Sequence, residues 1–243
     1  MTVLLSIVVP CYNEGKNIPF LVKRFLEAKK DNTSSQLVMV NNGSTDNSLR
    51  LMRQFAAKYS SINIVNIKYN KGYGHGIWSG ISKASGKFIA WTHADLQTDI
   101  KDAFVAYDLI KHKIDNKTCF VKGKRKKRAF FDSFFSYAMS IFESIVFGRI
   151  VYDINAQPNL FHREFLKQVH NPPLDFSFDL FIYLTALYSK QKIIRFPVDF
   201  PERIHGQSHW NTGIRDKYKF IKRTISFTWE LKRRMRKNDN SRT

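Results

Sequence analysis

The sequence predicts an α/β fold, with a doubly wound and mainly parallel sheet that carries helices on both faces. Two observations indicate it. Over residues 4–91, short apolar runs alternate with segments of helical spacing, an order that implies parallel strands joined by crossover helices. Polar clusters follow the apolar runs, and open α/β sheets bind ligands at that edge. With 243 residues, 43% of them hydrophobic, the chain can bury a substantial core.

The strands are expected where short β-branched or aromatic runs lie between polar segments. Leu4–Val9 contains no charged residue, as expected of a strand covered on both faces. Phe88–Trp91 is similar and ends in the polar cluster around Asp95. The other expected strands lie at Gln36–Val40, Ile62–Ile67 and, in the second half, Ile193–Val198.

The helices are expected between these strands. Asn17–Lys29 places its apolar residues on one face at helical spacing. The second helix follows a turn at Asn41–Asp46, in which Ser44 or Asp46 could cap the helix N-terminus. A third, glycine-containing helix is expected at Gly72–Ala84.

The second half of the chain has three unusual segments. Val121–Arg128 is strongly basic and is either a solvated loop or a phosphate-binding segment. Phe130–Tyr152 is aromatic and apolar, which suits either a buried helix or one that contacts lipid. Tyr218–Lys237 predicts an amphipathic helix with a broad apolar face opposite a basic one, which could lie in a membrane interface or dock on the domain.

Composition narrows the classes of function. The formal net charge of +20 calls for an anionic partner, and no common nucleic-acid-binding module is recognisable. Cys11 and Cys119 lack metal-ligand spacing and suggest a reducing compartment. No apolar run reaches the roughly 20 residues of a membrane span. Val3–Val9 is too short for a signal peptide, so we expect a cytoplasmic protein.

Asp95 is the first candidate site residue, because it follows a buried strand. A carboxylate there can hold Mg²⁺ or Mn²⁺, which in turn can hold a diphosphate, whereas a solvated turn is the alternative. Tyr12 could stack on a base or take part in ordinary packing. Asn42 offers an amide to a base edge or is an ordinary turn residue. Gly72 could let the backbone approach a nucleotide.

Other carboxylates could act as a general base, which a hydroxyl acceptor of a transferred group would need. Asp153, Asp175 and Asp179 are the candidates. A phosphate monoester is already anionic and needs cations that place it, a task that suits guanidinium groups. The residues considered for that task are Arg125, Arg128, Arg203 and, as a hydrogen-bond donor, Ser208.

Seven motifs occur in order over about residues 5–210. They are Ser6–Glu14, Asn42–Asp46, Asn70–Gly74 with Gly80, His93–Gln97, Gly123–Arg128, Asp153–Arg163 and Pro197–Trp210. Together, this ordered set resembles the family 2 glycosyltransferases. The segment His93–Gln97 resembles the Asp-Ala-Asp-Leu-Gln signature of the branch that charges polyprenyl phosphates and that includes dolichyl-phosphate mannosyltransferase.

The resemblance implies a glycosyltransferase A-type fold and an inverting sugar transfer. The donor would be a UDP- or GDP-linked sugar, and the acceptor a polyprenyl phosphate at the cytoplasmic face of a membrane. A saccharide hydroxyl is the alternative acceptor, and a non-catalytic or nucleic-acid-binding protein is less expected. The chain would divide into a catalytic domain at 1–210, with a nucleotide-sugar half at 1–99 and an acceptor half at 100–210, and a basic helical tail at 211–243.

The resemblance also implies the site residues. Asp95 and Gln97 would bind the metal. Asp95, Arg125, Arg128, Arg203, Asp153 and Asp179 would form the catalytic group. The substrate would be bound by Pro10, Tyr12, Glu14, Asn42, Ser44, Lys71, Gly72, Ala94, Asp95, Gln97 and Ser208.

The sequence departs from the family pattern in three segments. His93 replaces the first aspartate of the signature, Asn41 and Asn42 stand where aspartate is frequent, and His209 stands where lysine is usual. These departures leave the expected fold unchanged. They leave the sugar, the nucleotide and the acceptor open.

Overall fold

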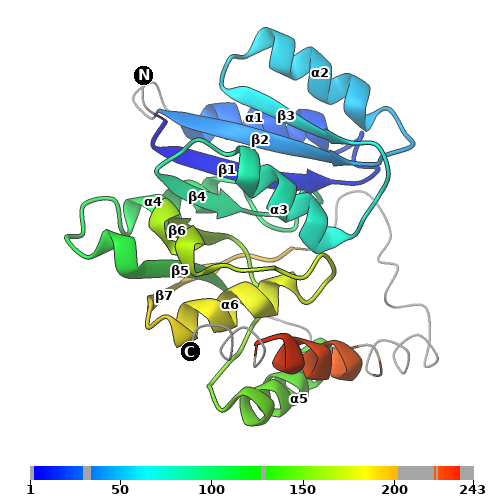
Figure 1. Ribbon diagram of the computed structural model, residues 1–243. Helices are drawn as coiled ribbons and strands as arrows, with labels where there is room; N and C mark the ends of the chain where they lie inside the picture. Colours follow the sequence, from blue (N-terminus) through cyan, green and yellow to red (C-terminus); the bar gives the residue numbers. More distant parts are fainter. Residues whose placement is uncertain (1–2, 30–33, 127–129, 202–221, 223, 236–243) are drawn as a thin grey trace.

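The computed structural model describes residues 3–29, 34–126, 130–201, 222 and 224–235 (Figure 1). The strands are β1 (Leu5–Cys11), β2 (Ser35–Asn42), β3 (Ile62–Ile67), β4 (Phe88–Trp91), β5 (Cys119–Arg125), β6 (Asn159–His162) and β7 (Lys192–Val198). The α-helices are α1 (Ile18–Lys29), α2 (Ser48–Lys58), α3 (Tyr73–Lys83), α4 (Lys101–Asp108), α5 (Phe130–Phe147) and α6 (Phe178–Tyr188). Two 3₁₀ turns are η1 (Asn116–Thr118) and η2 (Arg163–Gln168).

One seven-stranded sheet in the order β3-β2-β1-β4-β6-β5-β7 forms the centre of the molecule (Figure 1). Strands β3, β2, β1 and β4 are parallel to one another, and β5 is parallel to β7. Strand β6 is antiparallel to both β4 and β5. The predicted doubly wound, mainly parallel sheet is therefore confirmed, and the sheet spans both halves of the predicted catalytic domain. The predicted boundary at residue 210 lies outside the described residues.

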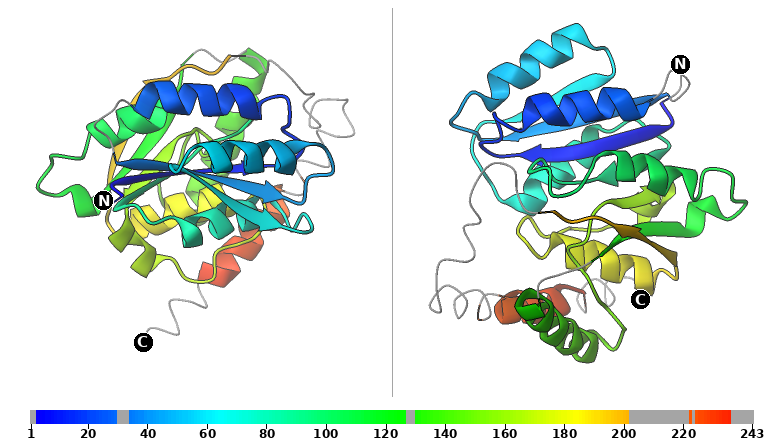
Figure 2. Two further views of the ribbon diagram at one scale, coloured as in Figure 1. Left: turned by 90° about the horizontal axis from the view of Figure 1, so that it is seen from above. Right: turned by 180° about the vertical axis from the view of Figure 1, so that it is seen from behind.

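Helices cover both faces of this sheet, as the views from above and behind also show (Figure 2). Helices α1, α2 and α4 pack on one face around Leu5, Ile7 and Val9. Helices α3 and α6 pack on the other face, and the C-terminal end of α5 joins their cluster through Val146 and Phe147. Successive side chains of β1 point to opposite faces of the sheet, since Val8 belongs to the core on this second face. This explains why the strand reads as a continuous apolar run.

The turn predicted at Asn41–Asp46 is wrong in its first two residues, because β2 continues to Asn42. Asn41 is in register with Asn66 of β3, and its Nδ2 donates to Asn66 Oδ1 at 2.7 Å. Helix α2 begins only at Ser48, and Ser44 does not cap it. Asp46 Oδ1 accepts a hydrogen bond from the Ser48 N–H at 2.9 Å instead.

The interpretation of Val121–Arg128 as a solvated loop is wrong as far as Arg125, because these residues belong to β5. Lys122 is fully buried. Its Nζ donates to Ala156 O at 2.9 Å and to Asn159 Oδ1 at 2.8 Å, and these two acceptors offset part of the cost of burying an ammonium group.

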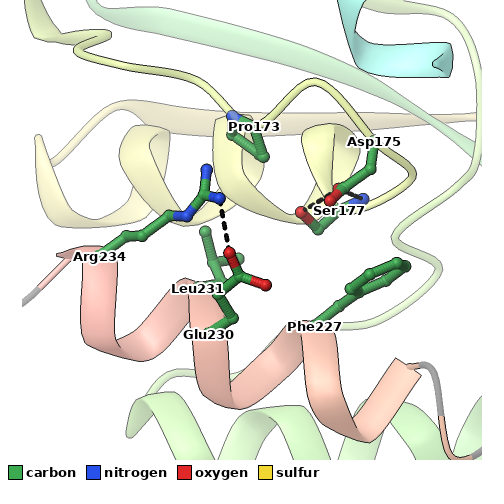
Figure 3. A pocket seen from close by; sticks show the side chains of 7 residues that line it. All are labelled: Pro173, Asp175, Ser177, Phe227, Glu230, Leu231 and Arg234. Carbon is green, nitrogen blue, oxygen red and sulfur yellow. Dashed lines mark hydrogen bonds and ion pairs between the residues drawn. The ribbon is translucent and has the colours of Figure 1, made fainter. Parts of the chain in front are cut away.

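Residues 222 and 224–235 are the described part of the helix predicted at Tyr218–Lys237, and residues 224–235 are called the C-terminal helical segment below. Thr228 and Leu231 are buried, whereas Trp229 is 51% exposed. Figure 3 shows Leu231 and Phe227 facing the segment Pro173–Ser177 across a shallow pocket. The segment therefore docks on the domain along one side and leaves another side exposed. Among the described residues, no helix has the length and apolar character needed to cross a membrane.

Helix α3 lies unusually close to the sheet at Gly80. A Cβ added there would overlap the side chain of Val8 and would come within 2.7 Å of Val40 Cγ2. Both valines are fully buried and have little room to move. A glycine at this position is therefore required by packing and not by its backbone conformation.

Gly80→Ala tests this close packing. Helix propensity alone would stabilise the protein by up to about 1 kcal/mol, because alanine is the better helix former. We expect overpacking to outweigh this gain and to lower the free energy of unfolding by about 1–3 kcal/mol, measured by urea denaturation. Ser82→Ala, at an exposed position of the same helix, is the control and should change stability by less than about 0.5 kcal/mol. An unchanged or raised stability of Gly80→Ala would contradict the account.

Candidate functional site

The candidate site lies where the parallel strands β1, β2 and β4 end. In register, Cys11 pairs with Asn41 and Val8 pairs with Trp91, so the three strands reach the same edge of the sheet. The loops that follow them carry the sequence-predicted residues of the first half. This is the edge at which α/β sheets bind ligands.

The loop His93–Gln97 presents alternate side chains to this edge. His93, Asp95 and Gln97 are partly exposed, whereas Ala94 and Leu96 are buried. Leu96 has a φ of 61°, a left-handed conformation that costs a non-glycine residue of order 1–3 kcal/mol. Its buried side chain belongs to the core beneath β1 and offsets that cost. The predicted metal ligands Asp95 and Gln97 thus share one side of the loop.

Asp95 and Gln97 offer the oxygen donors that suit a hard divalent cation. Gln97 Nε2 donates to Pro201 O at 3.2 Å, and since that carbonyl can only accept, the hydrogen bond identifies which side-chain atom of Gln97 is the nitrogen and which is the oxygen that could ligate a cation. Within the described part of the chain, no group of three or more His, Cys, Asp or Glu side chains could hold an ion. This donor set fits Mg²⁺ or Mn²⁺ held jointly by a carboxylate, water and substrate phosphates.

The loops after β1 and β2 are tied together by Asn13. This residue has a φ of 57°, and its Oδ1 accepts from the Thr45 N–H at 2.8 Å and the Asp46 N–H at 3.3 Å. The Asn13 N–H donates in turn to Ser44 Oγ at 3.1 Å. Asn13 is a site residue that the sequence reasoning missed, and its signal was the tolerance of asparagine for left-handed backbone.

The predicted residues of these loops differ in the exposure of their side chains and in the hydrogen bonds they already make within the protein. Tyr12 is 49% exposed, so its ring could stack on a base. Glu14 Oε2 accepts from Asn17 Nδ2 at 2.6 Å, and Ser44 Oγ accepts from Asn13, so both already have partners within the protein. Pro10 is partly buried at the end of β1.

Asn42 is 4% exposed and is fixed in one orientation. Its Nδ2 donates to Gly72 O at 3.0 Å and to Asn70 Oδ1 at 3.3 Å. Because a backbone carbonyl can only accept, the atom facing Gly72 must be the amide nitrogen. Asn42 Oδ1 has no hydrogen-bond partner among the described residues. Lys71, between these two partners in sequence, is exposed.

In the acceptor half, the structure brings Arg125 and Asp153 together. Asp153 Oδ1 accepts from the guanidinium of Arg125 at 2.7 Å and 2.5 Å, and Oδ2 accepts from the Arg125 N–H at 2.9 Å. The same guanidinium lies 5.1 Å from the centre of the Phe200 ring. Arg128, Arg203 and Ser208 lie outside the described residues, and their roles stay predictions.

Asp179 lies in the first turn of α6 and is 3% exposed. Its carboxylate accepts from Tyr73 Oη at 2.9 Å, Trp91 Nε1 at 3.0 Å and Gln157 Nε2 at 3.2 Å. Burial, followed by the charge of Asp179, raises the pKa of Tyr73 well above its usual value, so the phenol remains a donor. The sequence reasoning missed these three donors, although a buried Trp N–H usually requires an acceptor.

Comparison with known proteins places the chain in a family. The model of glycosyl transferase family 2 matches residues 6–169. A dolichyl-phosphate beta-glucosyltransferase of Dictyostelium discoideum is 30% identical over 185 residues, which cover 69% of this chain and 56% of that protein. The chain therefore spans about half the length of this relative.

Two solved structures show the same fold. Glucosyl-3-phosphoglycerate synthase from Mycobacterium tuberculosis, in complex with Mn²⁺, UDP and phosphoglyceric acid, has a TM-score of 0.71 at 14% identity, covering 94% of this chain and 78% of its own. A mannosyltransferase from Pyrobaculum calidifontis, in complex with GDP-Man and Mn²⁺, has a TM-score of 0.63 at 19% identity, covering 84% and 58%. The expected glycosyltransferase A-type fold is thereby confirmed.

The family match extends from β1 through β6 to η2, and so includes both the loops at the sheet edge and the Arg125–Asp153 pair. The resemblance inferred from the motifs is confirmed, and the chain belongs to glycosyl transferase family 2.

Proposed function

We propose that this chain transfers a sugar, with inversion, from a nucleoside-diphosphate sugar to a polyprenyl phosphate. The observation that carries the proposal is the loop His93–Gln97, which presents Asp95 and Gln97 together at the ends of parallel strands. The dolichyl-phosphate substrate in the name of the Dictyostelium relative supports the acceptor. The two similar structures contain Mn²⁺ together with GDP-Man or UDP, which supports the donor and a divalent cation.

In this proposal, each loop at the sheet edge binds one part of the donor. Tyr12 stacks on the base and Asn42 reads its edge, while Asn13 keeps the two loops in register. A divalent cation on Asp95 and Gln97 would neutralise the negative charge that develops on the leaving diphosphate. No covalent nucleophile motif is recognisable in the sequence, which supports direct in-line attack and hence inversion.

The acceptor is proposed to be a phosphate because each candidate base already accepts hydrogen bonds within the protein. Asp153 is paired with Arg125, and Asp179 accepts three hydrogen bonds. Asp175 Oδ1 accepts from the N–H and the hydroxyl of Ser177 at 2.9 Å and 2.6 Å. A saccharide hydroxyl would need one of these carboxylates as its base, whereas a phosphate monoester, with a second pKa of about 6, needs none.

The base is proposed to be uracil and not guanine. The amide nitrogen of Asn42 is committed to Gly72 and Asn70, so the acceptor that Asn42 can offer is Oδ1, a buried atom without a partner among the described residues. The imide edge of uracil has one N–H to donate, whereas guanine has adjacent N–H and NH₂ donors. A second donor left unpaired in a buried site costs about 1–3 kcal/mol.

The chain is proposed to bind peripherally to the cytoplasmic face of an anionic membrane. Ile225 and Trp229 of the C-terminal helical segment are 37% and 51% exposed, beside the basic residues Lys232 and Arg233. Exposed apolar and cationic side chains on one helix suit an anionic interface. The buried Leu231 holds the helix on the domain, so docking and membrane contact are compatible.

Asp95→Ala tests the metal role. With a panel of sugar nucleotides, Mg²⁺ or Mn²⁺ and a short polyprenyl phosphate, we expect turnover to fall about 10²–10³-fold, because charge stabilisation worth several kcal/mol is lost. The readouts are the released nucleotide and the glycolipid. Asp108→Ala, whose carboxylate is 60% exposed on α4, is the matched control and should retain full activity. Near-normal turnover of Asp95→Ala would exclude the metal role.

Nucleotide preference tests the role of Asn42. In calorimetry with Mn²⁺, UDP should bind at least about ten-fold more tightly than GDP, because one donor of the guanine base would remain unpaired. Asn42→Leu removes the acceptor and should weaken UDP far more than GDP, so that the preference disappears. Equal affinities in the unaltered protein, or tighter binding of GDP, would contradict the proposal.

Vesicle flotation tests membrane contact without disturbing the docked face. Trp229→Ala should lower recovery with anionic vesicles on the order of ten-fold, because one large apolar side chain no longer inserts, and should leave the melting temperature unchanged. Tyr69→Ala, at an aromatic residue that is 65% exposed on the β3–α3 connection, is the control. Recovery of the unaltered protein should also fall at 1 M salt. Equal recovery of both variants would reject this surface.

A further inference from the structure

A chain of buried hydrogen bonds crosses the molecule from α3 to β5. Tyr73 donates to Asp179, which also accepts from Gln157. Gln157 Oε1 accepts from Asn159 Nδ2 at 2.7 Å, and Asn159 Oδ1 accepts from Lys122 Nζ at 2.8 Å. Burial lowers the pKa of Lys122 to about 7, while the charge of Asp179 opposes that shift. The network therefore connects the nucleotide half with the acceptor half.

Asp179 is poorly placed to remove a proton from an acceptor. A general base must come within about 2.6–3.2 Å of the group it deprotonates. Asp179 is 3% exposed, and its two oxygens already accept from Tyr73, Trp91 and Gln157. Because the carboxylate is buried beneath these donors, an acceptor could reach it only if the surrounding side chains moved.

Tyr73 connects this network to the metal-binding loop. Its ring is stacked on His93 with centres 5.8 Å apart and planes at 26°, and on Phe176 with centres 5.5 Å apart and planes at 9°. His93 begins the loop that carries Asp95 and Gln97, and the left-handed Leu96 shows that this loop is strained. The hydroxyl of Tyr73 is held by Asp179, so the position of the ring under His93 depends on that carboxylate.

Backbone hydrogen bonds and close packing next to Tyr73 fix the position of this residue. The Gly74 and His75 N–H groups donate to Asp175 O at 3.2 Å and to Leu174 O at 2.9 Å. A Cβ on Gly74 would come within 2.5 Å of Pro173 O, so only glycine lets α3 approach this segment so closely. The start of α3 is thus clamped to the segment that leads into α6 and Asp179.

We infer that Asp179 is a positioning residue that holds Tyr73 under His93, and thereby orients the His93–Gln97 loop, and that it is not the base of the reaction. The inference rests on the proposed function, because it assigns a role within that sugar transfer. It gives a structural use to His93, which departs from the aspartate of the family signature: an imidazole ring can stack on Tyr73, and a carboxylate cannot.

Three variants separate positioning from base catalysis. Asp179→Asn keeps the size of the side chain and an acceptor oxygen but removes the basic group. Tyr73→Phe keeps the ring but removes its bond to Asp179. Tyr188→Phe is the control, because its hydroxyl donates to Phe147 O at 2.7 Å and plays no part in this network. Each variant is measured for turnover as a function of pH and, without substrate, for hydrogen exchange of residues 92–98.

For positioning, Asp179→Asn should keep turnover within about ten-fold with an unshifted pH profile. Tyr73→Phe should accelerate hydrogen exchange at residues 92–98 several-fold, and Tyr188→Phe should not. Loss of a true base would instead lower turnover of Asp179→Asn about 10²–10⁴-fold and remove the acid limb of the pH profile. That result, or equal exchange in Tyr73→Phe and Tyr188→Phe, would overturn the inference. Failure of the proposed function would appear separately, as absence of turnover in the unaltered protein.

Discussion

The burial of β1, β2 and β4 on both faces is the constraint on which the site depends. Side chains along these strands are enclosed by the helices, so a ligand can reach polar groups only where the strands end. The strands are parallel, which brings three such ends to one edge. Tyr12, Asn42 and Asp95 therefore lie at this edge, because they follow or close these strands.

Hydrogen bonds and packing within the protein fix the loops at that edge before any ligand binds. Asn13 adopts a left-handed conformation and accepts hydrogen bonds from the neighbouring loop, and Leu96 adopts another with its side chain in the core. Both conformations cost energy, which packing and hydrogen bonds offset. Groups fixed in advance do not have to be ordered during the reaction, and that reduces the cost of binding a charged transition state.

The elements predicted most accurately from the sequence are those that depend on a local pattern of residues. Strand Phe88–Trp91 was located to the residue, because an uninterrupted apolar run ends abruptly there. Asn41 and Asn42 were assigned to a turn because asparagine favours turns, whereas cross-strand pairing with Asn66 keeps them in β2. The partners of Asp179 lie 106, 88 and 22 residues away along the chain, and no local pattern indicates such contacts. The antiparallel β6 was missed for the same reason.

The proposed transfer of the sugar to a phosphate requires no carboxylate base. The most direct measurement compares two acceptors of equal chain length, a polyprenyl phosphate and the corresponding polyprenol, with the preferred sugar nucleotide and Mn²⁺. The account predicts a glycolipid product, with inverted configuration at the anomeric carbon, from the phosphate alone. Equal or faster transfer to the alcohol would contradict it, because that reaction needs a base which the described structure holds in other contacts.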